Sequence, residues 1–65
     1  MIEQYLQALA AALAGADPAL VQDALYDAEE YLRSEFADCP EGDEACHAAV
    51  LERYGTPEEV AAAYL

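Results

Sequence analysis

Turn-forming and helix-capping residues interrupt this 65-residue chain at three places, and the stretches between them carry apolar residues at helical spacing. The interruptions lie at residues 15–18, 38–43 and 55–57. Each combines glycine or proline with an aspartate or threonine that can cap the next helix. The pattern predicts an all-α fold, a small bundle of about four short helices over residues 2–14, 18–36, 44–54 and from 57 onward.

The segment from Thr56 to Glu59 is the strongest local signal in the chain. Threonine is a good N-cap, proline is favoured at the first helical position, and acidic residues are stabilised in the positive first turn of a helix. Thr56 and Glu59 also have the spacing of a capping box, in which each side chain accepts the other residue's backbone N–H. The sequence therefore predicts a helix that begins at Pro57.

The length of the chain allows one small helical domain, residues 1–65, with a thin core. Sixteen alanines supply much of the apolar composition, so large apolar side chains are few and burial must come from close approach of the helices. Helical projection places several large side chains on inward faces. The predicted core is Leu6, Leu9, Leu13, Leu25, Leu32, Val50, Leu51 and Val60.

Acidic residues outnumber basic ones by 14 to 2, which gives a net charge of −12 at pH 7. Such a surface repels phosphate backbones, so we expect no direct binding to nucleic acid. A basic protein is the favoured kind of partner, although acidic helix faces also simply keep a protein in solution. In the second predicted helix, Asp23, Asp27 and Glu30 share the face opposite the apolar one, and Tyr26 also projects away from the apolar arc. These four are the candidate partner-binding residues.

Glu35 falls within the apolar arc of the same helix, where an unpaired buried carboxylate would be costly. The preferred explanation is that the helix frays before Asp38. The alternative is that Arg53 pairs with Glu35, which requires the third helix to pack against this end of the second.

Cys39, Cys46 and His47 form the one cluster with the residue types for metal or thiol chemistry. A structural zinc site needs four ligands, and this spacing offers three, so we predict no metal site. A disulfide would close a short loop and contribute roughly 2 to 3 kcal/mol, but it requires an oxidising environment. In a cytosol both thiols would stay reduced, which is the interpretation we favour in vivo, and closure in air remains an alternative.

Residues that would support catalysis are scarce. Ser34 is the sole serine and lies on the polar side of its helix, and a lone histidine such as His47 is more often structural. There is neither a glycine-rich phosphate loop nor a metalloprotease motif. The sequence predicts a non-enzyme with no catalytic residue and no cofactor.

The hydropathy pattern contains no apolar run of about 18 residues and no basic flank typical of a signal peptide. We therefore expect the chain itself to be soluble. Its apolar helical pattern continues to Leu65 without a C-terminal glycine, which indicates a fragment of a longer protein.

Three segments together resemble the HAAS family, the helical signalling domain associated with helix-turn-helix regulators. They are Tyr5-Leu6 with Leu9, the run from Asp27 to Leu32, and the run from Leu51 to Ala61. The most specific part is Tyr54-Gly55-Thr56-Pro57-Glu58-Glu59-Val60-Ala61, which is similar to the closing pattern of the family. The resemblance spans nearly the whole chain.

The resemblance implies a bacterial cytoplasmic domain at the N-terminus of an inner-membrane protein, held at the membrane only through a continuation after Leu65. It also implies a partner, a PadR-like transcription regulator, and no enzymatic activity. Two functions then compete: an interaction and signalling module that docks this regulator, or a structural cap that can self-associate as a homo-oligomer. A thiol or metal sensor built on Cys39, Cys46 and His47 is a distant third.

Overall fold

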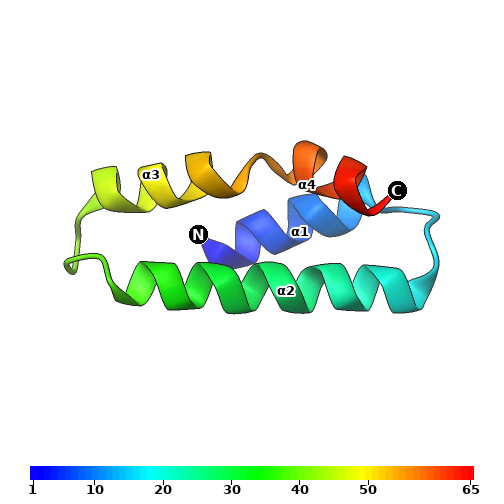
Figure 1. The fold of residues 1–65 in the computed structure, drawn as a ribbon, viewed down its shortest axis with the longest axis horizontal. Coiled ribbons are helices and arrows are strands. Elements are labelled where there is room, and N and C mark those ends of the chain that lie inside the picture. The colour runs from blue at the N-terminus through cyan, green and yellow to red at the C-terminus, as the bar shows by residue number, and fades with distance from the viewer.

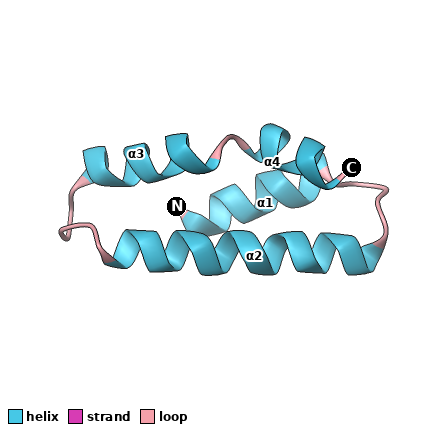
Figure 2. Cartoon of the chain, in the orientation of Figure 1, coloured by secondary structure: helices cyan, strands magenta, loops and turns pink.

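The computed structural model describes all 65 residues and consists of four helices and no strands (Figure 2). Helix α1 spans Ile2–Ala12, α2 spans Pro18–Ala37, α3 spans Glu44–Tyr54 and α4 spans Pro57–Tyr64. The all-α prediction is confirmed. The predicted helix boundaries agree with the observed ones within two residues. The differences are that α1 ends at Ala12 rather than at residue 14 and that α2 runs one residue past residue 36.

The longest helix, α2, runs the length of an elongated molecule that measures 37 × 16 × 16 Å. Helices α3 and α4 follow each other along α2 in the opposite direction, like one long helix broken at Gly55 (Figure 1). Helix α1 packs against both α4 and α2. It does not extend to the end of the molecule that holds the α2–α3 loop, so that end is only two helices thick (Figure 1).

Capping side chains start three of the helices. The Asp17 carboxylate accepts the backbone N–H of Ala19 at 2.8 Å, and the Asp43 carboxylate accepts that of Cys46 at 3.0 Å. At α4 both halves of the capping box are present. These bonds satisfy backbone groups that a helix N-terminus leaves without partners, which is why local residues alone predict the starts well.

The core is small, and three of its nine buried residues are alanines, as the high alanine content of the chain leads us to expect. Nine residues are buried: Tyr5, Leu9, Leu13, Ala24, Ala28, Leu32, Val50, Val60 and Ala61. Five of the eight predicted core residues are among them. Leu6, Leu25 and Leu51 are only half-buried and pack against the edge of this cluster, so their assignment as core is wrong. In α2 the fully buried positions are taken by Ala24, Ala28 and Leu32, which leaves Leu25 at the margin.

A cluster of tyrosines holds the break between α3 and α4. The Tyr5 hydroxyl from α1 donates to the Gly55 carbonyl at 2.7 Å, and the Tyr5 ring is tilted against Tyr54 with 5.9 Å between centroids. Tyr54 in turn stacks on Tyr31 of α2 at 4.6 Å. Gly55 has a φ of 108° and a ψ of 164°, a backbone conformation that essentially only glycine adopts. The tyrosine cluster therefore fixes the joint at which α4 begins.

Candidate functional site

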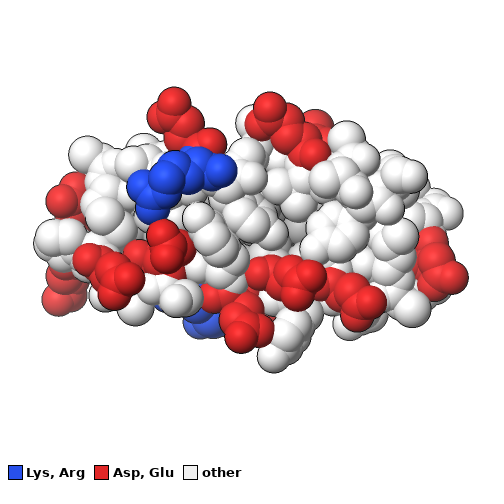
Figure 3. Space-filling model, in the orientation of Figure 1, with Lys and Arg blue, Asp and Glu red and all other residues white.

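The four candidate partner-binding residues lie along one side of α2 and are all exposed: Asp23, Tyr26, Asp27 and Glu30. We call this side the outer face of α2. Carboxylates form a row along the lower edge of the molecule, where α2 runs (Figure 3). The outer face exists because Ala24, Ala28 and Leu32, at the opposite positions of the helix, are buried. The four candidate residues are thus exposed, as helical periodicity predicts.

Tyr26 is the most exposed aromatic side chain in the chain, with 65% of its surface accessible. It lines a shallow hollow with Glu29, Glu30 and Arg33. The Glu30 carboxylate beside the Tyr26 hydroxyl raises the pKa of that phenol above its ordinary value. Tyr26 therefore offers an aromatic ring next to negative charge.

Neither of the two arginines neutralises the carboxylates of the outer face. Arg33 pairs with Glu29 at 2.8 Å, and Arg53 pairs with Glu35 at 3.0 Å. The carboxylates of Asp23, Asp27 and Glu30 are therefore left without a cationic partner within the chain, and the outer face carries uncompensated negative charge.

Asp27 has a role that the sequence does not reveal, because its carboxylate accepts a hydrogen bond from the Tyr64 hydroxyl of α4 at 2.9 Å. Burial, followed by this bond, raises the pKa of Tyr64 to about 12. Asp23 and Tyr64 line the same shallow hollow, together with Leu20. Asp27 thus ties α4 to α2 at the edge of the outer face, while Asp23 and Glu30 are in no such bond.

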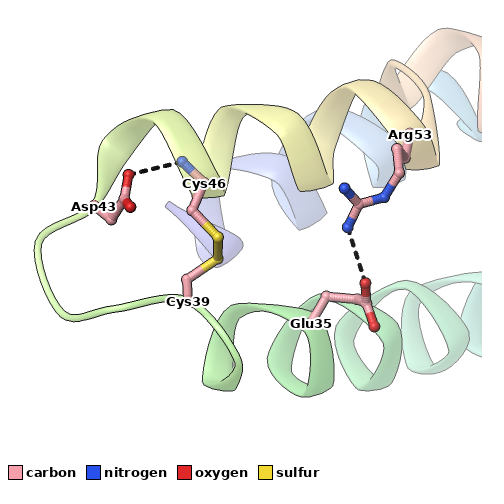
Figure 4. The surroundings of a disulfide bond; sticks show 5 residues. All are labelled: Glu35, Cys39, Asp43, Cys46 and Arg53. Carbon is pink, nitrogen blue, oxygen red and sulfur yellow. Dashed lines mark hydrogen bonds and ion pairs between the residues drawn. A yellow bond between two sulfur atoms is a disulfide. The ribbon is translucent and has the colours of Figure 1, made fainter.

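Glu35 and Arg53 form an ion pair between α2 and α3 (Figure 4). The helix continues to Ala37, so fraying before Asp38 is the wrong explanation for Glu35, and the alternative pairing with Arg53 is the one observed. Both side chains retain substantial solvent exposure, so this pair contributes little to stability.

Cys39 and Cys46 are joined by a disulfide whose Cα atoms lie 5.8 Å apart (Figure 4). The sequence left two interpretations of this pair open, reduced thiols and a disulfide. The structure contains the disulfide and has no free cysteine. His47 packs against the ring of Phe36, with 4.6 Å between ring centroids. No group of three or more histidine, cysteine or acidic side chains has an arrangement that could hold a metal ion.

No helix of the chain combines the length and the apolar character needed to span a bilayer.

Ser34 lies exposed on α2 near the outer face.

The segment that carries the most specific part of the resemblance, Tyr54 to Ala61, forms the joint between α3 and α4 described above. Its glycine breaks the helix, its threonine and glutamate cap the next one, and Val60 and Ala61 are buried.

The comparisons with known proteins give one match. The family model described as HAAS matches residues 4–63, nearly the whole chain. No curated protein and no solved structure matches.

Proposed function

This chain belongs to the HAAS family, and from that premise we propose that it acts as a non-catalytic docking module for a PadR-like transcription regulator. HAAS domains are small helical signalling or interaction domains, and the HAAS family is not a known enzyme family. The observation that carries the proposal for this chain is the outer face of α2, where an exposed tyrosine stands among carboxylates without cationic partners.

Charge favours a basic partner on this face. The whole chain carries −12, and both of its arginines are already paired with Glu29 and Glu35. A transcription regulator that binds DNA must present cationic surface, since it neutralises phosphates with lysine and arginine. Complementary charge of this kind speeds encounter and orients the partner more than it adds affinity.

Tyr26 supplies the contact that charge alone does not. Exposed tyrosines are frequent anchors of protein interfaces, because a large rigid ring buries much area at a small cost in conformational entropy. With the Glu30 carboxylate beside it, the ring suits an arginine side chain, which can stack on the aromatic face while its guanidinium meets the carboxylate.

The test is the association rate with a candidate PadR-like regulator from the same genome, measured over a series of salt concentrations. The variant Asp23→Asn/Glu30→Gln removes two charges from the outer face and leaves the Asp27–Tyr64 bond intact. The matched control Glu41→Gln/Glu52→Gln removes the same charge from exposed positions in the α2–α3 loop and on α3.

We expect the first variant to associate more slowly and to lose part of its salt dependence, because exposed charges steer encounter only within a screening length of about 8 Å at physiological ionic strength. The control should follow the wild type more closely. Equal rates and equal salt slopes for the two double variants would refute docking on the outer face.

The position of the domain in the cell is a second part of the proposal. By its resemblance to the family, we propose that it is the cytoplasmic part of a bacterial inner-membrane protein, attached through residues that follow Leu65. The full-length reading frame tests this. One or more apolar spans of about 20 residues after Leu65 are expected, and a continuation without them would contradict it.

A further inference from the structure

The end of the molecule that holds the α2–α3 loop is packed more weakly than the rest. None of the nine buried residues lies between Leu32 and Val50. Helix α1 does not extend to the tip of this end (Figure 1), although Met1 and Ile2 line a hollow with Phe36. Regions with few buried apolar contacts open locally at low free-energy cost, before the whole domain unfolds.

Several contacts hold α3 against α2. Near the α2–α3 loop, the Phe36 ring lies 4.6 Å from the His47 ring between centroids, and the disulfide joins Cys39 to Cys46. Further along α3, Arg53 pairs with Glu35 (Figure 4), and Tyr54 stacks on Tyr31. The ion pair contributes little because it is exposed to solvent. Phe36 is only half-buried, at the margin of the core. The disulfide is the covalent contact across this end.

We propose that Cys39 and Cys46 form a redox-sensitive clamp on the α2–α3 end. When the disulfide is closed, the loop and the first turns of α3 are held against α2. When it is open, residues 38–47 move independently, and the core around Leu9, Leu32 and Val60 remains folded. This device is separate from docking on the outer face of α2, whose residues take no part in it.

The position of the sulfurs makes such exchange feasible. Both cysteines are half-buried, with Cys39 at the margin of the core, so a local opening of this end is enough to expose them to a small thiol or disulfide. Cys46 lies in the first turn of α3, where its backbone N–H is held by the Asp43 carboxylate at 3.0 Å. In the closed form this cap fixes the helix start that carries Cys46.

Closure is a thiol–disulfide exchange with a small disulfide such as oxidised glutathione. One cysteine thiolate attacks a sulfur of the oxidant, its S–S bond breaks, and one glutathione leaves while a mixed disulfide forms. The second cysteine attacks the protein sulfur of that mixed disulfide and releases the other glutathione. Two electrons and two protons pass to the oxidant, and opening by reduced glutathione is the reverse.

The size of the effect follows from the length of the loop. Cys39 and Cys46 are separated by seven positions, and on the chain-entropy model a cross-link over a loop of this length favours the folded over the unfolded arrangement of the segment by a factor of about 50. The hydrogen-bonded amides of the segment should therefore exchange about 50-fold faster when the disulfide is open; they are those of Asp38, Cys39, Asp43, Cys46 and His47.

Hydrogen exchange followed by mass spectrometry tests the clamp on the chain after equilibration with glutathione at a series of reduced-to-oxidised ratios. We expect peptides covering residues 38–47 to switch between slow and fast exchange within this series, while peptides from α1 and α4 keep their protection. The variant Cys39→Ser cannot close the ring, so it should show fast exchange at every ratio. Its circular dichroism should remain helical.

Three outcomes would overturn the proposal. The first is exchange in residues 38–47 that does not depend on the glutathione ratio. The second is loss of protection throughout the chain on reduction, or an unfolded Cys39→Ser variant, since either would make the disulfide a staple of the whole fold. The third is a disulfide that stays closed at every ratio, as read from the mass of the alkylated chain.

Discussion

Replacing Tyr5 by phenylalanine isolates the hydrogen bond that ties α1 to the joint between α3 and α4. The change keeps the ring, which packs against Tyr54, and removes only the hydroxyl that donates to the Gly55 carbonyl at 2.7 Å. Tyr5 is 8% exposed and Gly55 is half-buried, so water has restricted access to the carbonyl once the hydroxyl is gone. A carbonyl left without its partner in such a place costs about 1 to 2 kcal/mol.

In a domain of this size, that loss corresponds to a fall of about 4 to 16 °C in the melting temperature. The assay is thermal unfolding followed by far-UV circular dichroism. Tyr26→Phe is the matched control, because it deletes the same atom from a residue that is 65% exposed. The control should stay within about 0.5 kcal/mol of the wild type. Equal melting temperatures for the two variants would refute the role assigned to the Tyr5 hydroxyl.

Three further predictions concern stability. Leu32→Ala should lower the free energy of unfolding by about 2 to 5 kcal/mol because Leu32 is fully buried, while Leu25→Ala should lower it clearly less because Leu25 is half-buried. Equal losses of unfolding free energy in urea denaturation would contradict this. Thr56→Ala removes the N-cap of α4 and should cost about 0.5 to 2 kcal/mol in the same assay, and an unchanged midpoint would argue against the capping box. Burial raises the pKa of Tyr5 and of Tyr64 from 10.0 to about 12. The free energy of unfolding linked to these neutral phenols is therefore complete below pH 10 and is lost as the pH rises through 12. A free energy of unfolding that does not change between pH 10 and 12 would disprove this.

The helix starts could be predicted from the sequence because capping is local. The Thr56 side chain and the backbone N–H of Glu59 are three residues apart, and their geometry follows once the helix begins. The exposure of the outer face of α2 could be predicted for a similar reason, since helical periodicity alone puts Asp23 and Glu30 opposite the buried Ala24 and Ala28.

Contacts between helices could not be predicted in the same way. Tyr5 and Gly55 are 50 positions apart, Asp27 and Tyr64 are 37 apart, and Glu35 and Arg53 are 18 apart. Whether such pairs meet depends on how far each helix slides along its neighbour, and periodicity leaves that distance open.

The depth of burial depends on the same packing. Periodicity puts Leu25 on the inward side of α2, but Ala24 and Ala28 take the fully buried positions and Leu25 lies at the margin of the core. The state of Cys39 and Cys46 depends in addition on the redox environment, which no pattern of residues records.

Titration of the isotope-labelled chain with a candidate PadR-like regulator from the same genome, followed by amide chemical shifts, tests the proposed docking on the outer face of α2 most directly. The prediction is that the largest changes fall between Asp23 and Glu30, and that Tyr26→Ala weakens binding without altering the spectrum of the core. Changes confined to α1 or α4, or no change with the regulator in excess, would contradict the proposed function.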